Sequence, residues 1–450
     1  MRLRLTSRRR AGAPAAILAI AAAALLSACS DPGDGSGSGG NGPDNTIAAP
    51  SRPTVPDNLS DETGVYADRV VFGQSAALGG AAAELGLGMQ LGILAAFEEA
   101  NRAGGVNGRQ LDLVSLDDKY EPEAAIANTR ALIEEQEVFA LIGAVGTPTS
   151  RSATPVAAAA EVPYVAPFTG AGFLRNDDWT NIINLRASYA QETAGLVENF
   201  IQVGRRRIGV FYQADAYGRS GWAGVRAALA RHGERIVGEA TYRRGTQFTA
   251  TMRGQVELLQ AAEPEAVICI GAYAACAAFA RDAVDLGLRV PIANLSFVGS
   301  ESMLGLLSEG RDAEDAERYT SLLVNSQVVP SYHDTSMPAV REYRGLMERY
   351  NPDMPAELVT ESYAPFDFSF VSLEGFLDAK IMVEILRRLG DEPSRGDLER
   401  AVMTLRDYEI GISERVTFAE DRRQGLQQVY YTVVDDGRFV TLNDWQGKFS

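Results

Sequence analysis

Short apolar runs of strand length alternate with amphipathic helical stretches along most of this 450-residue chain, and this alternation constrains its fold more than any other feature. The pattern begins near Asp68 and runs through two successive series, which meet near residue 187. Alternating strands and helices predict parallel sheets with helices on both faces. Because the chain is also too long for one compact core, the sequence predicts an α/β fold of two doubly wound parallel-sheet lobes.

The last third of the chain departs from this simple alternation. Residues 319–329 predict one long strand, and three helices are expected between residues 338 and 405. Two closing strands are joined by Asp435-Asp436-Gly437, a combination that is typical of a hairpin turn. These two strands need a partner sheet, and the second lobe is the simplest one to supply it.

The first 67 residues have a different composition. A basic start with five Arg precedes an apolar run that is too short for a comfortable membrane span, followed by the motif LSAC, which ends at Cys29. This resembles a bacterial lipoprotein signal, with residues 1–28 removed and Cys29 carrying lipid as a membrane anchor. The alternative is an ordinary signal peptide that contains a Cys. Residues 29–67 are rich in Gly, Ser, Pro and Asp, so we expect a flexible tether. Both alternatives place the mature chain outside the cytoplasm, in the periplasm or at the cell surface.

The net charge of the chain is −17, and it becomes −22 once the five Arg of the signal are removed. Such a surface repels nucleic acid and anionic lipid headgroups, so we expect no nucleic-acid partner. The chain has two His and lacks both the GxxxxGK[ST] phosphate loop and the GxSxG nucleophile motif. We therefore expect no cofactor, no metal site and no catalytic residues, and we do not expect an enzyme.

Besides Cys29, the chain has two cysteines, Cys269 and Cys276. They could form a disulfide in an oxidising compartment. Cys269 lies in an expected buried strand and Cys276 in the helix that follows, so two reduced thiols in the core are an equally good interpretation. The sequence leaves both alternatives open.

Five segments together resemble the solute-binding proteins of the leucine/isoleucine/valine-binding type, which are the extracytoplasmic subunits of bacterial ABC importers. The resemblance covers about residues 68–442, and it is most specific where AN-x-AGGVNGR is followed by a strand and a pair of Asp residues. It implies two α/β lobes joined by a three-segment hinge, with crossings near residues 187, 321 and 427. The segments are FGQSAALGGAAAELG (72–86), FEEANRAGGVNGRQLDLVSLDD (97–118), LIGAVGTPTSRSATP (141–155), VPYVAPFTGAGFLR (162–175) and DAYGRSGWAGVRAAL (215–229).

On this resemblance, the first lobe comprises residues 68–187 and 322–427, and the second comprises 188–321 and 428–450. The resemblance implies a monomer that captures a small ligand in the cleft between the lobes and presents it to a cognate ABC permease. The ligand is expected to carry a carboxylate, as an amino acid or an aromatic or aliphatic organic acid. The alternative function is ligand sensing by an ectodomain of the same fold. The missing catalytic motifs argue against a third alternative, an exported enzyme.

The candidate ligand site begins with Gly146-Thr147-Pro148-Thr149-Ser150, which lies between an apolar strand and a helix. Open α/β sheets bind ligands at the carboxyl ends of their strands, and the free N–H groups at a helix start attract an anion. An ordinary helix start with Pro in the first turn would give the same local pattern. The resemblance implies that Thr147 contacts a ligand carboxylate, and we expect Thr149 to bind beside it.

A second strand-end loop of the first lobe covers residues 167–171. The resemblance implies that this loop offers a backbone carbonyl and a hydroxyl to the ligand's α-amine. In this chain the position that bears the hydroxyl is Gly170, and Thr169 stands one place earlier. We expect both residues to line the ligand site. Leu85 takes a position in the wall of the pocket where relatives often have an aromatic residue. Glu84 beside it is expected to face solvent.

The loop over residues 295–299 departs from the family pattern. Amino-acid binders that resemble this chain place an acidic residue there to pair the ligand's ammonium, whereas this chain has Ser and Phe297. A buried ammonium without a carboxylate is costly, so the sequence favours a carboxylate with an apolar or aromatic body over an α-amino acid. Tyr189, Tyr217 and Tyr273 stand at strand–helix junctions of the second lobe. Each is compatible with an ordinary half-buried Tyr, and together they predict stacking on the ligand.

Overall fold

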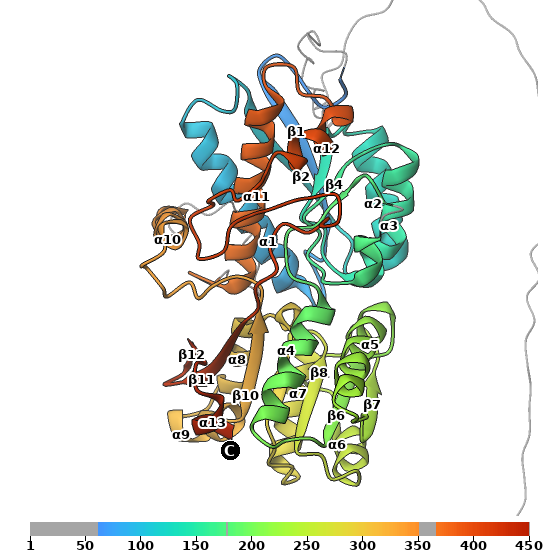
Figure 1. Ribbon diagram of the computed structural model, residues 1–450, viewed down its shortest axis with the longest axis vertical. Helices are drawn as coiled ribbons and strands as arrows, with labels where there is room; N and C mark the ends of the chain where they lie inside the picture. The colour runs from blue at the N-terminus through green and yellow to red at the C-terminus, as the bar shows by residue number, and fades with distance from the viewer. Residues whose placement is uncertain (1–61, 177–178, 351–365, 450) are drawn as a thin grey trace, which may run out of the picture. The chain divides into compact units, whose positions relative to one another are not determined.

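The computed structural model describes residues 62–176, 179–350 and 366–449, which contain two separate sheets (Figure 1). The expected signal peptide, the lipidated Cys29 and most of the expected tether lie outside these residues. The first sheet is parallel, with the strand order β2-β1-β3-β4-β5. Its strands are β1 (Arg69–Ala76), β2 (Gln110–Asp117), β3 (Ala140–Ile142), β4 (Tyr164–Val165) and β5 (Ile182–Ile183).

Helices from two distant parts of the chain cover the first sheet. We call this sheet and its helices the first lobe. In Figure 1, α1 and α11 lie on one side of the strands, and α2 and α3 lie on the other. The helices are α1 (Ala83–Arg102), α2 (Pro122–Glu134), α3 (Thr147–Ala159), the 3-10 turn η1 (Gly172–Arg175), α10 (Pro338–Tyr350), α11 (Phe370–Leu389) and α12 (Arg395–Met403).

The second sheet has the strand order β12-β11-β10-β9-β8-β6-β7, and we call it and its helices the second lobe. Its pairs from β10 to β7 are parallel, and the C-terminal hairpin of β11 and β12 joins its edge in antiparallel fashion. The predicted α/β fold with doubly wound parallel sheets is therefore confirmed. The strands are β6 (Ile208–Gln213), β7 (Gly238–Tyr242), β8 (Ala266–Ile270), β9 (Ile292–Asn294), β10 (Leu323–Gln327), β11 (Tyr430–Asp435) and β12 (Arg438–Thr441). The helices are α4 (Tyr189–Gln202), α5 (Ala216–Arg231), α6 (Arg253–Gln260), α7 (Tyr273–Asp285), the 3-10 turn η2 (Ser296–Val298), α8 (Ser300–Ser308), α9 (Ala313–Thr320) and α13 (Trp445–Phe449).

Close packing of α1 against α11 explains the small residues on one face of α1. A Cβ atom placed on Gly92 would lie 2.0 Å from the carbonyl oxygen of Ser372, so only glycine fits there. Gly88 lies against Val371 of the same helix, where an added Cβ would be 3.0 Å from the side chain. The C-terminal third of the chain thus contributes to the first lobe, because its helix α11 packs against α1.

The second crossing, expected near residue 321, is displaced in the structure. Residues 319–329 do not form one strand: α9 ends at Thr320, and β10 spans Leu323–Gln327. β10 belongs to the second sheet, where it pairs with β9 on one side and β11 on the other. The chain therefore leaves the second lobe only after Gln327, because β10 lies between β9 and the closing hairpin in that sheet.

The other two crossings run side by side. Asn184 forms a parallel bridge with Gln424, and the amide of Leu426 donates to the carbonyl of Leu185 over 2.7 Å. The segment after β5 and the segment before β11 therefore form a hydrogen-bonded pair between the two lobes. A hinge of this kind couples the ends of both sheets.

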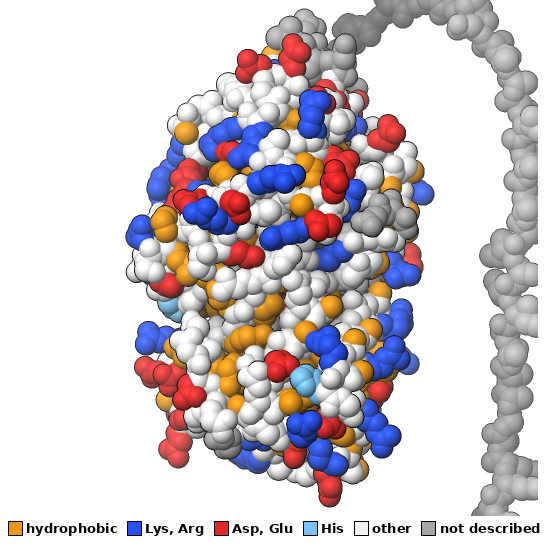
Figure 2. All heavy atoms as spheres, in the orientation of Figure 1, with side chains coloured by type: hydrophobic (Ala, Val, Ile, Leu, Met, Phe, Trp, Pro, Cys, Tyr) orange, Lys and Arg blue, Asp and Glu red, His pale blue; other side chains and the backbone are white. Residues whose placement is uncertain are grey.

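The surface seen in Figure 2 carries both acidic and basic side chains, and hydrophobic side chains gather in a band across its middle. None of the helices in the described ranges is long and apolar enough to cross a membrane.

Candidate functional site

Two neighbouring strand ends of the first lobe bring Thr147 and Thr169 together. The hydroxyl oxygens of the two residues lie 2.7 Å apart, and both side chains are buried. Gly146, just before Thr147, has φ +103°, and a Cβ placed there would lie 2.1 Å from the ring of Tyr120. Glycine is therefore required both by the backbone conformation and by the close ring. The predicted loops do meet at one edge of the sheet.

The start of α3 presents free backbone donors beside this hydroxyl pair. Its N-cap is Gly146, which supplies no side-chain cap, and Pro148 stands in the first turn. The amides of Thr147 and Thr149 have no intrahelical partner, as in every first turn of a helix. The Thr149 hydroxyl instead donates to the carbonyls of Val145 and Gly146. Thr149 therefore offers its amide, rather than its hydroxyl, to an anion.

Gly170 is in direct contact with Tyr189, the first residue of α4. The Tyr189 amide donates to the Gly170 carbonyl over 2.8 Å, and a Cβ on Gly170 would lie 2.5 Å from the Tyr189 nitrogen. The Gly170 carbonyl is thus occupied by the second lobe. Burial raises the pKa of Tyr189, while the nearby hydroxyls of Thr169 and Thr147 lower it in part. The Tyr189 hydroxyl therefore lies near those of Thr147 and Thr169, but it forms no hydrogen bond with a described residue. We call these three hydroxyls the polar cluster.

Five buried rings from both lobes fill the space next to this polar cluster, and we call them the ring cluster. Tyr217 lies 5.1 Å from Tyr189 and 4.8 Å from Phe297, measured between ring centroids. Phe297 in turn lies 5.3 Å from Phe168 and 5.8 Å from Tyr120. Tyr120 and Phe168 come from the first lobe, and the other three come from the second. The ring cluster therefore joins the lobes through aromatic contacts.

Two hydroxyls of the ring cluster, those of Tyr189 and Tyr217, are buried without a hydrogen-bond partner among the described residues. Burial is the largest cause that raises the pKa of Tyr217 well above its usual range. A buried hydroxyl without a partner costs free energy, and a polar ligand atom would remove that cost.

Leu85 and Tyr273 meet on the other side of the loop that carries Phe297. Gly299 has φ +74°, and a Cβ placed there would lie 2.7 Å from the Leu85 side chain and 3.4 Å from Tyr273. Both side chains are buried. Glu84 does not face open solvent as expected, because the first turn of α1 packs against α7 and α8. Burial raises the pKa of Glu84, and the hydroxyl of Ser302 lowers it in part.

Arg186, a residue that the sequence analysis did not single out, lies beside the ring cluster at the first crossing. Its guanidinium lies 4.8 Å from the ring of Phe168. It forms ion pairs with Glu192 at 3.4 Å and Glu374 at 3.3 Å, and it donates to the hydroxyl of Ser296. Burial raises the pKa of Glu374 to about 7. A single Arg gave no signal in the sequence, because Glu374, one of its two carboxylate partners, lies far along the chain.

A second polar contact between the lobes is centred on Arg244. Its guanidinium contacts Glu121 of the first lobe at 2.6 Å and Asp215 of the second at 3.2 Å. The amide of Gln213 donates to the hydroxyl of Tyr120 over 3.3 Å. A small pocket lies beside this contact, lined by Ala81, Ala82, Tyr120, Gln213, Tyr242, Arg244 and Ala272 among others.

Comparison with known proteins identifies the family of the chain. The family model described as "Periplasmic binding protein" matches residues 69–438. The chain belongs to the periplasmic binding protein family. Within it, the similarity is to the leucine/isoleucine/valine-binding type. A solved structure described as a possible leucine/isoleucine/valine-binding protein from Rhodopirellula baltica is 34% identical, with a TM-score of 0.75, over 87% of this chain and 100% of that one.

Two curated relatives match over shorter stretches. An amino acid binding protein of Pseudomonas aeruginosa is 24% identical over 220 residues, which are 49% of this chain and 58% of the relative. A chemotactic signal transduction system substrate-binding protein of Halobacterium salinarum is 28% identical over 190 residues, or 40% of this chain and 44% of the relative. The chain thus spans about half the length of these curated relatives. Membership of the family places this binding protein outside the cytoplasm.

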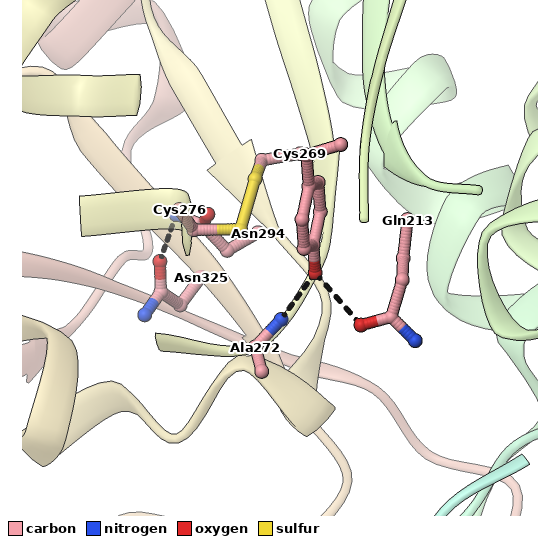
Figure 3. Close-up of a disulfide and its surroundings, with 7 residues drawn as sticks. Gln213, Cys269, Ala272, Cys276, Asn294 and Asn325 are labelled. Carbon is pink, nitrogen blue, oxygen red and sulfur yellow. Dashed lines mark hydrogen bonds between the residues drawn. A yellow bond between two sulfur atoms is a disulfide. The ribbon is translucent and has the colours of Figure 1, made fainter. Parts of the chain in front are cut away.

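Cys269 and Cys276 of this binding protein form a disulfide, which resolves the alternative that the sequence left open. Cys269 lies in β8 and Cys276 in α7 (Figure 3). Just beside the bond, the hydroxyl of Tyr242 accepts from the amide of Ala272 over 3.0 Å and donates to Gln213 over 3.0 Å. The disulfide and these hydrogen bonds therefore fix the start of α7.

The predicted site residues of the binding protein divide into two groups in the structure. The first group surrounds the polar cluster of Thr147, Thr169 and Tyr189, with the Gly170 carbonyl bonded to the Tyr189 amide. The rings of Tyr217 and Phe297 continue this group from Tyr189. Leu85 and Tyr273 lie beyond Gly299. Sequence reasoning missed Tyr120 and Phe168. Phe168 directly precedes the predicted site residue Thr169, and this position in the sequence was a signal that it could also contact the site.

Proposed function

We propose that this chain is the solute-binding subunit of an ABC importer, anchored to the membrane by lipid at Cys29. Its ligand is a small molecule with a carboxylate, which binds between the two lobes. The observation that supports this most directly is the hydroxyl pair of Thr147 and Thr169 beside the uncapped start of α3. Free amides and hydroxyls at one helix start form a preorganised site for an anion.

In the proposed complex, the ligand carboxylate accepts hydrogen bonds from the Thr147 hydroxyl and from the amides of the first turn of α3. Hydrogen bonds to a charged group contribute about 1.5–3 kcal/mol each. The hydroxyl of Tyr189, from the second lobe, lies at the same cluster. A ligand that contacts both lobes binds the closed state more tightly than the open one, and it therefore favours closure.

We propose binding without chemistry at this site. Within the described residues, the hydrogen-bond partners of the Thr147 and Thr169 hydroxyls are each other and the amide of Ala171, and the hydroxyl of Tyr189 lies nearby. A nucleophilic hydroxyl requires a general base within hydrogen-bond reach. Neither hydroxyl has such a base among these partners, so the arrangement favours recognition of an acid over its conversion.

Ligand sensing is the second candidate function. It is favoured by the relative from Halobacterium salinarum, whose name assigns it to chemotactic signal transduction. Deleting the gene and measuring both uptake and chemotaxis toward the ligand separates the two candidates. Loss of uptake with normal chemotaxis supports the importer subunit. Loss of chemotaxis with normal uptake supports the sensor.

Two experiments test the proposed function. The first is a thermal-shift screen of the purified protein with organic acids and their primary amides; acids should raise Tm, and a neutral amide that stabilises equally would contradict the carboxylate. The second compares processing of Cys29→Ser with the natural chain. The variant should remain an unprocessed or mislocalised precursor, and normal maturation would contradict the lipid anchor. A firm anchor needs more than one acyl chain.

A further inference from the structure

The start of α8 reaches from the second lobe to the first, and it carries a buried carboxyl group at the point of contact. Glu301, the second residue of α8, is only 8% exposed. Its Oε1 atom accepts from the amide of Phe370 over 3.3 Å, and Phe370 is the first residue of α11 in the first lobe. We call the arrangement of the lobes with this contact the closed state.

We infer that closure of the two lobes is linked to the uptake of a proton by Glu301, so that mildly acidic surroundings favour the closed state. The inference concerns the lobes themselves, with or without a ligand. Only its consequence for affinity rests on the proposed function: a ligand that favours closure should then bind more tightly as the pH falls.

Hydrogen bonds fix the start of α8 to the second lobe. The Ser300 hydroxyl accepts from the side-chain amides of Asn325, over 2.9 Å, and Gln327, over 2.7 Å. Both of these residues belong to β10, inside the second sheet. Glu301 therefore moves with the second lobe, and separation of the lobes breaks its contact with Phe370 and returns its carboxyl group to water.

Two neutral donors hold the Glu301 carboxyl group in the closed state. One is the Phe370 amide, and the other is the hydroxyl of Tyr332, a buried residue at the second crossing whose ring lies 4.9 Å from that of Phe370. Burial raises the pKa of Glu301 to about 7, although both donors lower it in part. No Lys or Arg of the described residues is among the causes of this shift. A proton on the carboxyl group therefore compensates for its burial where a cation does not.

A second carboxyl group, from the first lobe, lies beside the start of α8. Glu84 in the first turn of α1 is half-buried, and its carboxyl group contacts the hydroxyl of Ser302, the residue after Glu301. Burial raises the pKa of Glu84 as well, and the charge of Glu84 acts on Tyr273 of α7. The first turn of α11 has no acidic residue. Closure therefore buries negative charge from both lobes at one contact.

Other ionisable groups surround Tyr332. The ring of His333 lies 4.4 Å from that of Tyr332, and burial lowers the pKa of His333. Arg344 of α10 donates to the Tyr332 carbonyl over 3.3 Å. Burial, and to a lesser extent the charge of Glu301, raises the pKa of Tyr343 of α10. Neither His333 nor Arg344 is among the causes that shift Glu301, so these groups do not replace the missing cation.

The direction of the linkage follows from the two environments of Glu301. In the open state its carboxyl group is hydrated, and its pKa returns toward the usual 4.5, whereas in the closed state it is about 7. Proton binding therefore favours the closed state fully below about pH 4.5, and this contribution is lost as the pH rises through about 7. One such group changes the ratio of closed to open protein by at most about tenfold per pH unit.

The test measures the distance between the lobes without any ligand. Spin labels are attached through Glu135→Cys in the first lobe and Ala227→Cys in the second, both at exposed positions, in the full-length chain with Cys29→Ser. Pulsed dipolar spectroscopy gives the shares of short and long distances. We expect the ratio of closed to open protein to fall about tenfold between about pH 5.5 and about pH 7.5. In Glu301→Gln the ratio should stay constant over this range.

Matched variants separate the proton from other effects of substitution. Glu309→Gln changes an exposed acid at the end of the same helix and should keep the pH dependence of the natural protein. Glu301→Asp retains a carboxyl group and should keep a pH dependence. Tyr332→Phe removes a donor to the carboxylate, so the midpoint should move to higher pH, whereas His333→Asn should leave the midpoint in place.

Three results overturn the inference. They are a ratio that does not change with pH in the natural protein, an unchanged pH dependence in Glu301→Gln, and an unmoved midpoint in Tyr332→Phe. Failure of the proposed function has a different signature: no organic acid of the thermal-shift screen raises Tm, while the distance between the lobes still depends on pH through Glu301. That result supports the proton-linked closure and contradicts the carboxylate ligand.

Discussion

The hydroxyl oxygens of Thr147 and Thr169 lie 2.7 Å apart at the ends of two adjacent parallel strands. Each hydroxyl can both donate and accept, so the pair can turn its donors toward an incoming anion without moving the backbone. This property makes the pair sensitive to single substitutions.

Thr147→Ala removes one donor to the proposed carboxylate. We expect affinity for acids to fall about tenfold to a hundredfold, because a hydrogen bond to a charged group is worth roughly 1.5–3 kcal/mol. Calorimetric titration measures this change. Thr147→Ser keeps the hydroxyl and should bind nearly as tightly as the natural protein; equal losses in both variants would contradict a role for the hydroxyl.

Tyr217→Phe removes a buried hydroxyl that has no partner among the described residues. We expect the ligand-free protein to gain about 1–3 kcal/mol of stability, because that is the cost of an unsatisfied buried polar group. Affinity should fall at the same time if the ligand pairs with this hydroxyl. Chemical denaturation and titration measure the two effects, and a variant that is less stable without ligand would show that the hydroxyl is satisfied.

Tyr217→Ala also removes the ring that joins Tyr189 to Phe297. We expect weaker binding and loss of ligand-induced compaction, since the closing contacts come from the second lobe. Solution scattering with and without ligand measures the radius of gyration. No change in the natural protein at saturation would rule out closure as the mechanism.

Stability should depend on pH through Glu301, which lies in α8. Burial raises the pKa of Glu301 from 4.5 to about 7. The folded state then binds a proton more tightly than the unfolded state, so the free energy of unfolding should fall as pH rises from about 4.5 to about 7, by roughly 1.4 kcal/mol per unit at most. Glu301→Gln should flatten this part of the profile. A variant with the same slope in thermal unfolding as the natural protein would exclude Glu301 as the cause.

The disulfide should stabilise both the fold and the site. Replacing Cys269 and Cys276 together by Ala should cost about 2–3 kcal/mol, as expected for closure of a short loop. Affinity should fall as well, because Tyr273 lies between the two cysteines. Denaturation and titration of the double variant are compared with the oxidised protein. Unchanged affinity despite lower stability would limit the disulfide to a structural role.

Local patterns in the sequence were sufficient to predict the alternation of strands and helices. They also predicted the position of Thr147 at a strand–helix junction. Periodicity and the start of a helix depend on neighbouring residues, so a single chain displays them directly.

The tertiary structure decided the features that depend on residues far apart in the chain. It assigned β10 to the second sheet, brought Tyr120 and Phe168 to Phe297, and surrounded Arg186 with Glu192 and Glu374. It also left Glu84, which was expected to face solvent, half-buried with its Oε2 atom enclosed. The physical reason is that burial and charge pairing arise from contacts between segments. Local sequence fixes which residues are available for such contacts, and only packing determines which of them meet.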